Sequence, residues 1–354
     1  MTVLMSVYNG ERFVRQAIVS VLRQTWSDFE FLIINDGSTD RTREFVASFL
    51  DPRIRLVDNP SNVGLTRSLN RGLELARGEF VARQDADDLS HPTRLAEQVA
   101  FMRSNPDVAL VGTQARVIDE RGRVRRRPGW ERAVDDAAIR FQLMLDNAFI
   151  HSSVLFRRGL VWGRLGGYDA GFRTGQDFEL WSRVAARYPV RNLARSLVDY
   201  RTRAGSTAAR YGEDHLRLSR AVVAANLSRH LGLAHVPDEW PRLVSGMHVN
   251  PPAVAETELL KLADVACEIF GRFVGRGPGV RTERGVLRVL ACKLCQVACR
   301  LAGGARREAL ATFDRARRFD AETARSFAAK FFPLLLFGGR ARALLSPAAV
   351  RGVL

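Results

Sequence analysis

Short apolar segments alternate with polar breaks and helical patterns through residues 1–90. The apolar segments are Val3–Val7, Glu30–Ile34, Arg53–Val57 and Glu79–Arg83. Between them, Ser38–Asp40 offers N-cap candidates for one helix, and Gly64–Ala76 has the spacing of another. Repeated strand–helix units predict an α/β fold in which a mostly parallel sheet is flanked by helices on both faces.

Polar segments follow several of these strands directly. YNGE comes after the first strand, NDGSTD after the second, and QDADD after the fourth. In open parallel sheets, ligands bind outside the carboxyl ends of the strands. The polar segments therefore indicate where a site lies, although NDGS alone is also an ordinary turn sequence.

The pattern changes near residue 210. Before it, we expect strands at Val108–Val117, Arg123–Arg126 and Ile150–Phe156, a helical stretch to Leu145, and a helix at Gln176–Tyr188. After it, the chain is helical and rich in Ala, Leu and Arg. We therefore expect an α/β domain over residues 1–210 and a helical region over residues 211–354.

The acidic turn after the fourth strand is the strongest candidate for chemistry. Asp85, Asp87 and Asp88 place three carboxylates in four residues. Like charges this close are costly unless a cation or hydrogen-bond donors balance them, which favours a Mg²⁺ or Mn²⁺ site completed by substrate phosphates. An acidic turn that caps the helix beginning near Pro92 explains the same residues.

Three motifs in this order resemble family 2 glycosyltransferases of the Rossmann-like GT-A fold. They are SVYNGERFVRQAIVSVLRQTWSDFEFLIINDGSTDRT, NVGLTRSLNRGLELARGEFVARQDADD and GGYDAGFRTGQDFELWSRV. The resemblance covers residues 1 to about 205. It implies inverting transfer of a sugar from a nucleotide diphosphate sugar, UDP being the commonest nucleotide, with a divalent Mn²⁺ or Mg²⁺ on the diphosphate.

The resemblance also assigns residues to the donor. Tyr8 and Asp36 match positions that contact the base, with Val7 and Asn9 in the same turn. Arg67 matches a position that faces the nucleotide.

The catalytic positions follow in the same way. Asp85 and Asp87 match the aspartates of the DXD motif, Asp85 on the ribose or sugar side and Asp87 on the metal. Asp177 matches the catalytic base. The family commonly has Glu-Asp there, and this chain has Gln176-Asp177, so an inactive scaffold of the same fold stays an alternative.

The remaining assignments concern the acceptor and the diphosphate. His151 and Trp181 match positions near the acceptor pocket. Arg201 and Arg203 lie in YRTRAGS, where many relatives have His at the position of Arg203. A histidine contribution to metal binding is therefore in doubt, but positive charge for the diphosphate is retained.

These assignments define a simple mechanism. Asp177 takes the proton of the acceptor hydroxyl as that oxygen attacks the anomeric carbon. A metal on Asp87, with Arg201 or Arg203, stabilises the departing diphosphate.

Each assigned residue also has a structural interpretation. Asp177 can be a helix N-cap, His151 a buried hydrogen-bonded residue, Trp181 part of the core, and Tyr8 the end of a strand. The basic stretch Arg123–Arg127 is either a solvated hairpin edge or an acceptor-binding surface.

The chain has 354 residues and a formal net charge of +16, with the basic excess after residue 100. Such a surface attracts nucleic acid, anionic lipid or phosphorylated acceptors. The chain lacks zinc-finger spacing, an RNP-type strand and a basic heptad region, so we expect no nucleic-acid partner. A nucleotidyltransferase is disfavoured because no Gly-rich, Arg-containing loop follows the first strand.

Several features bear on location. No basic and then long apolar leader begins the chain, and the longest apolar run, Phe331–Phe337, is too short to span a bilayer. Four cysteines, three of them at Cys292, Cys295 and Cys299 with helical spacing, fit a reducing cytosol and an apolar core stripe better than a metal site. The amphipathic segments Leu287–Leu301 and Phe327–Leu345 suit either core packing or peripheral contact with the inner face of a membrane.

The resemblance implies a glycan or lipid-linked acceptor and bacterial surface polysaccharide or glycolipid synthesis. The sugar, the linkage and the oligomeric state are not specified.

Overall fold

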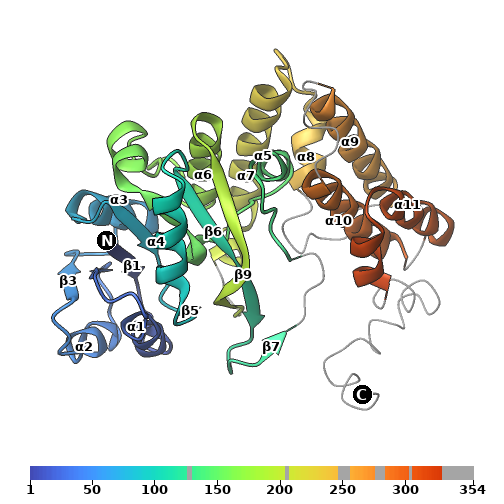
Figure 1. Cartoon of the computed structure of the whole chain (residues 1–354). Coiled ribbons are helices and arrows are strands. Elements are labelled where there is room, and N and C mark those ends of the chain that lie inside the picture. The colour runs from blue at the N-terminus through green and yellow to red at the C-terminus, as the bar shows by residue number, and fades with distance from the viewer. Residues whose placement is uncertain (126–129, 204–206, 246–255, 276–283, 303–304, 329–354) are drawn as a thin grey trace. The chain divides into compact units, whose positions relative to one another are not determined.

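A computed structural model describes residues 1–125, 130–203, 207–245, 256–275, 284–302 and 305–328 (Figure 1). The chain divides into two compact units. The first comprises Met1–Arg126, Val134–Ile139 and Asn147–Val222, and the second comprises Arg127–Ala133, Arg140–Asp146 and Val223–Leu354. Two short segments of the second unit thus come from within the range 1–210 expected for the α/β domain.

The first unit is built on one mixed sheet. Its strands are β1 (Thr2–Val7), β2 (Glu30–Asn35), β3 (Ile54–Asp58), β4 (Phe80–Arg83), β5 (Leu89–Ser90), β6 (Leu110–Ile118), β7 (Val124–Arg125), β8 (Leu155–Arg157) and β9 (Val190–Arg201). The strand order is β3-β2-β1-β4-β8-β6-β9-β5, with β7 paired to β6. Strands β3, β2, β1 and β4 are parallel, whereas β8 is antiparallel to both β4 and β6. The sheet is therefore parallel only in part.

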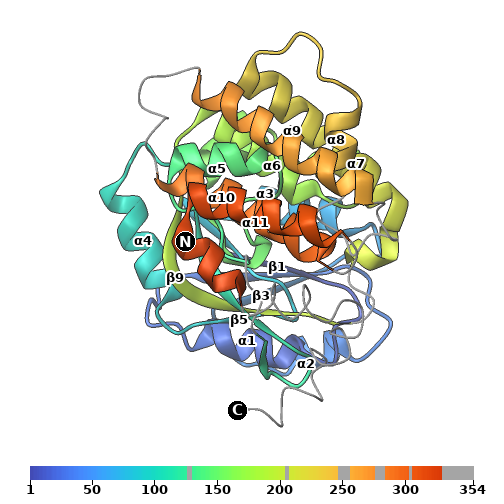
Figure 2. The ribbon, with the colours of Figure 1, turned by 90° about the vertical axis from the view of Figure 1, so that its right-hand side faces the viewer.

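Helices cover both faces of this sheet. They are α1 (Val14–Leu22), α2 (Thr42–Ala47), α3 (Leu65–Leu75), α4 (Arg94–Ser104), α5 (Asp136–Leu143), which passes into the second unit, and α6 (Gln176–Arg187). Because side chains alternate along a strand, Val3 and Met5 of β1 join a core with α1, α2 and α4, and Leu4 faces α3. Figure 2 shows α1 and α2 on one side of the sheet and α3 on the other.

The expected strands of residues 1–90 and the helix near 176–188 are confirmed to within one or two residues. The expected strand Ile150–Phe156 is wrong in its first half, where His151–Ser153 forms a 3₁₀ turn before β8. Strand β9 was not predicted. Of the basic stretch 123–127, the last two residues lie outside the described part of the chain.

The second unit is helical. Helix α7 (Thr207–Leu231) passes into it from the first unit and is followed by α8 (Glu239–Ser245), α9 (Glu256–Val274), α10 (Arg284–Leu301) and α11 (Arg306–Phe319). Helix α10 packs against both α9 and α11 (Figure 1). Cys295 and Cys299 are buried in α10, as an apolar stripe predicts. The run Phe331–Phe337 and residues 329–345 lie outside the described residues, and none of the described helices is long and apolar enough to cross a membrane.

Candidate functional site

Three predicted site segments meet at one edge of the sheet. Tyr8, Asp36 and Asp85 each lie just beyond the carboxyl end of β1, β2 or β4. These strands are neighbours and parallel, and Val7 pairs in register with Asn35. The structure therefore brings the donor and acidic segments to the edge where α/β proteins bind ligands.

Asp36 organises the loop before α3. It is buried, and its carboxylate accepts hydrogen bonds from Asn59 Nδ2 at 2.7 Å and from the backbone N–H groups of Val63 and Gly64 at 3.0 Å each. The neighbouring Gly37 has φ +67°, and a Cβ there would lie 2.5 Å from the backbone of Ser61. Asp36 thus holds the 59–64 loop against the end of β2, and a base contact would have to share this carboxylate.

The other donor candidates differ in accessibility. Tyr8 is 41% exposed and Arg67 is exposed in the first turn of α3. Asn9, with φ +49°, accepts a hydrogen bond from Thr39 N–H on its Oδ1 at 2.9 Å. The Val7 side chain is in the core and its carbonyl accepts the Asp36 N–H at 2.8 Å, so the expected donor contact of Val7 stays a prediction for its backbone alone. Tyr8 and Arg67 are thus the accessible side chains of this group.

Asp85 is held by internal donors on both oxygens. Arg83 Nη2 bonds Oδ1 at 2.5 Å, and Ser152 Oγ donates to Oδ2 at 2.7 Å. Burial acts to raise the pKa of Asp85, but the charge of the buried Arg83, with His151 and the hydrogen bonds, outweighs it and lowers that pKa below its usual value. These contacts favour the ionised form of Asp85 and fix its carboxylate, of which the side chain is 25% exposed.

Asp88 lies deeper. Its Oδ1 accepts the Arg201 N–H at 2.7 Å, and Ser152 Oγ makes a short hydrogen bond to Oδ2. Burial, and then the charges of Asp87 and Asp85, raise the pKa of Asp88 well above its usual value. Because Ser152 has one hydroxyl proton and contacts both carboxylates, a proton on Asp88 allows both contacts to be hydrogen bonds.

Like Asp85, whose side chain is 25% exposed, Asp87 is a partly exposed carboxylate of the turn. Its side chain is 25% exposed, and Oδ2 accepts a hydrogen bond from Arg203 Nε at 2.8 Å. Burial and the charge of Asp85 raise the pKa of Asp87, and the contact with Arg203 opposes them. No other described residue donates to Oδ1.

Arg201 and Arg203 have different environments. Arg201 is buried, its guanidinium donates to Asp87 O and to Gln16 Oε1, and it lies 4.5 Å over the Phe13 ring. Arg203 is 44% exposed in its side chain. The expectation that Arg201 binds the donor is therefore corrected, since its donors are committed to the scaffold.

Asp177 is the second residue of α6. The N-cap is Gly175, in the left-handed conformation, so the N-cap interpretation of Asp177 is wrong. Asn147 Nδ2 donates to Asp177 Oδ2 at 2.8 Å. Gln176, which stands where the family has an acidic residue, is buried.

The charges of Asp177 and of the acidic turn all act on the phenol of Tyr200. Burial raises the pKa of Tyr200, on β9, and the charges of Asp88, Asp85, Asp87 and Asp177 all add to the rise. The segment before β8 contacts both groups directly: Asn147 Nδ2 donates to Asp177 Oδ2 at 2.8 Å, and Ser152 Oγ donates to Asp85 Oδ2 at 2.7 Å. The charges of Asp85 and Asp177 also both act to raise the pKa of His151.

The two acceptor candidates are buried. His151 Nε2 accepts from Arg83 Nε at 3.2 Å and lies 3.1 Å from Tyr168 Oη, and burial followed by the charge of Arg83 lowers its pKa. Trp181 is fully buried, and its ring packs against those of Phe149, Phe156, Tyr168 and His151. The expected acceptor contact of Trp181 is therefore corrected to a core role beneath the site. The buried, hydrogen-bonded interpretation of His151 holds.

The acidic turn is a poor fit for a divalent cation as its side chains lie. Asp85 and Asp88 have donors on both oxygens, and Asp87 is paired with a guanidinium. Among the residues that the structure describes, no group of three His, Cys, Asp or Glu side chains is placed to hold a metal ion. We therefore derive no step of the reaction through a metal.

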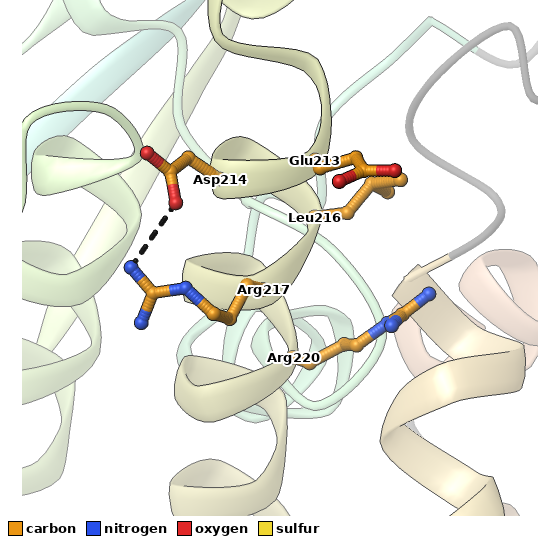
Figure 3. Close-up of a pocket in the computed structure, with 5 residues that line it drawn as sticks. All are labelled: Glu213, Asp214, Leu216, Arg217 and Arg220. Atoms are coloured by element: carbon orange, nitrogen blue, oxygen red, sulfur yellow. Dashed lines mark hydrogen bonds and ion pairs between the residues drawn. The ribbon is translucent and has the colours of Figure 1, made fainter.

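A surface cavity lies elsewhere in the first unit, along α7 (Figure 3). Its volume is about 390 Å³, and it is lined by Glu213, Asp214, Leu216, Arg217 and Arg220. Arg217 and Asp214 form an ion pair at 3.2 Å within it. None of the predicted site residues lines this cavity.

Sequence reasoning missed several supporting residues. Arg83 and Arg94 are buried beside the acidic turn, and burial with the charge of Arg83 lowers the pKa of Arg94 to about 9. Ser152 and Asn147 come from the segment before β8. Only Arg83 had a local signal, because it directly precedes QDADD.

Comparison with known proteins identifies relatives of this chain. The family model described as "Glycosyl transferase family 2" matches residues 2–165. The O-antigen biosynthesis glycosyltransferase WbnJ of Escherichia coli is 32% identical over 213 residues, which are 58% of this chain and 81% of WbnJ. The amylovoran biosynthesis glycosyltransferase AmsE of Erwinia amylovora is 31% identical over 223 residues, 61% of this chain and 81% of AmsE.

Solved structures support the fold. Residues 1–349 of S. aureus TarS in complex with UDP-GlcNAc align with a TM-score of 0.54 and 16% identity over 94% of this chain and 91% of that one. The mannosyltransferase PcManGT from Pyrobaculum calidifontis, in complex with GDP-Man and Mn²⁺, aligns with a TM-score of 0.52 and 19% identity over 94% and 86%. These similarities confirm the GT-A type of α/β fold. With the relatives that exceed 30% identity over most of their own length, they lead to one assignment: the chain belongs to glycosyltransferase family 2.

Proposed function

We propose that this glycosyltransferase moves a sugar from a nucleotide diphosphate sugar to a hydroxyl of a glycan or lipid-linked acceptor, with inversion at the anomeric carbon. The observation that carries the proposal is that one short segment contacts both Asp177 and the acidic turn, through Asn147 and Ser152. A base and a diphosphate-binding turn must face one cavity for a single displacement to occur. The ligands named for TarS and PcManGT support a nucleotide diphosphate sugar as donor, and UDP is favoured.

Asp177 acts as the base in this proposal. Asn147 occupies its Oδ2, which leaves Oδ1 to take the proton of the acceptor hydroxyl. The acceptor oxygen then forms a bond to the anomeric carbon as the bond to the diphosphate oxygen breaks. The proton ends on Asp177, and the negative charge ends on the departing nucleoside diphosphate.

The donor is bound by accessible residues at the sheet edge. Tyr8 and Arg67 flank the loop that Asp36 holds, which suits contacts to the base and nucleotide. Arg203 supplies positive charge beside Asp87 for the diphosphate. The Mn²⁺ or Mg²⁺ expected from the resemblance stays a prediction.

A thermal-shift screen tests the proposal. UDP-, GDP- and dTDP-sugars are added to the full chain with and without Mn²⁺, and the bound donor raises the melting temperature because it binds only the native state. With that donor, Asp177→Asn should keep the shift and lose about 10²- to 10⁴-fold in transfer rate. Asp107→Asn, in an exposed turn, is the matched control.

Two outcomes separate the alternatives. Donor binding with neither hydrolysis nor transfer would identify an inactive scaffold, as Gln176 allows. Salt-sensitive DNA binding without any donor binding would favour a nucleic-acid-binding protein.

The relatives named for O-antigen and amylovoran biosynthesis support a role in bacterial surface polysaccharide synthesis. We propose that the reaction occurs in the cytoplasm, at the inner face of the membrane, and that the helical region after residue 210 contacts the acceptor or the membrane.

A further inference from the structure

We propose that the guanidinium group of Arg203 takes the place of a divalent cation, so that this enzyme binds the diphosphate of its donor without a metal. The inference rests on the proposed function, because it concerns the same donor. It departs from the Mn²⁺ or Mg²⁺ that the resemblance implies.

The first argument is the state of the carboxylates. A divalent ion in such a turn needs one or two free carboxylate oxygens in addition to substrate phosphates. Asp85 has both oxygens engaged by Arg83 and Ser152, and Asp88 has both engaged by Ser152 and the Arg201 N–H. Only Asp87 Oδ1 is left without a donor among the described residues, and Oδ2 of the same carboxylate is 2.8 Å from Arg203 Nε, so a metal ion would have a single oxygen beside a guanidinium.

The second argument is charge. The three carboxylates lie among four guanidinium groups, those of Arg83, Arg94, Arg201 and Arg203. The turn therefore has no surplus of negative charge that would attract a divalent cation. A cation bound at Asp87 would also be repelled by the guanidinium that already pairs with this carboxylate.

The third argument is the geometry of Arg203 itself. Its Nε is bonded to Asp87, and no described residue accepts a hydrogen bond from its Nη1 or Nη2. Its side chain is 44% exposed, beside the carboxylate of Asp87, which is 25% exposed. A guanidinium fixed at Nε presents its two Nη groups as parallel donors, which match two oxygens of a diphosphate.

Arg203 would then fulfil both electrostatic tasks of a bound metal. It neutralises Asp87, and it donates charge-assisted hydrogen bonds to the diphosphate, which become stronger as the leaving group gains charge.

Calorimetric titration of the full chain with UDP and with GDP, in EDTA and in Mn²⁺, tests this inference. For the nucleotide that binds, we expect affinities in EDTA and Mn²⁺ that agree within about threefold, since guanidinium hydrogen bonds need no metal. Arg203→Ala should weaken binding in EDTA by about 10- to 100-fold, the loss typical of hydrogen bonds to a charged group.

Arg203→His is the decisive variant, because imidazole can join Asp87 as a metal ligand. We expect R203H to lose binding in EDTA and to recover it in Mn²⁺. After the heat of Mn²⁺ binding to free nucleotide is subtracted, titration of Mn²⁺ into the UDP- or GDP-saturated protein should give further heat with R203H and none with the wild type. Arg195→His is the matched control: Arg195 is on β9, which ends two residues before Arg203, is 65% exposed and pairs with Glu97 at 2.7 Å.

The outcomes are distinguishable. If Mn²⁺ strengthens wild-type nucleotide binding by about tenfold or more, the wild type has a working metal site and the inference is overturned, while the proposed function stands. If R203A binds as the wild type does in EDTA, Arg203 is not the diphosphate group and the inference also fails. If neither nucleotide nor any nucleotide sugar binds under either condition, the proposed function fails and the inference falls with it.

Discussion

Asp85 and Asp88 are three residues apart, yet their surroundings favour opposite protonation states. Asp85 faces the buried guanidinium of Arg83, and Asp88 is buried beside two other carboxylates. The same residue type therefore serves as the anion of a salt bridge at one position and favours the protonated form at the other.

This difference predicts opposite effects of the same substitution. Asp85→Asn leaves Arg83 charged and buried without its anion, so we expect a loss of about 3 kcal/mol in the free energy of unfolding. Asp88→Asn resembles the protonated acid and can keep the contacts to Ser152 and the Arg201 N–H, so the loss should be small. Urea unfolding at neutral pH measures both.

The pH dependence of Asp88→Asn has a defined sign. Because folding raises the pKa of Asp88, its contribution to stability is present below about pH 4, the usual carboxyl pKa, and is lost as the pH rises through the higher folded value. The stability of D88N relative to the wild type should therefore increase as the pH rises from about 4 to the folded pKa of Asp88. A constant difference would contradict the protonation argument.

With Asp177 as the proposed base, the hydrogen bond from Asn147 predicts a positioning role for this residue. Asn147→Ala removes the hydrogen bond to Oδ2, and we expect kcat to decrease by about tenfold or more while donor affinity is unchanged. Asn147→Asp keeps an acceptor for the Phe149 N–H but places a second carboxylate against the base, so its kcat should be lower still. Asn105→Ala, which removes a side-chain bond to a backbone carbonyl in α4, is the control. Wild-type kcat in N147D would contradict the assignment.

For single residues, the sequence predicted site residues that lie in a local motif but not the residues that hydrogen-bond to them. Asp87 and Asp177 could be singled out because each follows a recognisable pattern. Asn147 could not, because it lies thirty residues from Asp177 and meets it only through the fold. Trp181 was ambiguous, since a large aromatic on an apolar helix face suits both a core and a pocket wall.

Among the elements, the position of α3 depends on one glycine. A Cβ on Gly72 would lie 2.3 Å from Leu4 Cδ1, so the helix approaches β1 closely only because this residue has no side chain. The same helix carries Arg67, and the loop before it is held by Asp36.

We therefore expect Gly72→Ala to destabilise the protein by about 1–3 kcal/mol, as overpacking does, and to weaken donor binding. Thermal unfolding and donor titration measure the two effects. Gly163→Ala is the control, because a Cβ there meets no atom within 4 Å. Equal effects of the two substitutions would contradict this account.

The elements that could be predicted are those with a clear period and clear breaks. The strand–helix alternation of residues 1–90 has both, and the structure confirms it. Strand β9 was missed because its middle, Ala194–Ser196, is exposed and polar and gives no strand period. The antiparallel pairing of β8 with β4 and β6 could not be predicted either, because strand order depends on contacts between segments that are distant in the sequence.

For the whole molecule, the net charge of +16 has a consequence that can be measured. If the basic surface contacts the membrane, the full chain should sediment with vesicles that contain anionic lipid and remain in solution with neutral ones. Salt near 1 M, where the Debye length is about 3 Å, should release it. Binding that survives such salt, or no binding at low salt, would contradict a purely electrostatic peripheral contact.

The two units differ in their reactivity toward thiol reagents, because the cysteines are unevenly distributed. All four thiols, at Cys267, Cys292, Cys295 and Cys299, belong to the second unit. Burial raises the pKa of Cys292 to about 11 and that of Cys295 further, so neither is a ready nucleophile at neutral pH. Reagents that alkylate or oxidise thiols therefore have no cysteine target in the unit that carries Asp87 and Asp177. We expect sugar transfer to continue in the presence of reagents that inactivate enzymes with a cysteine in the active site.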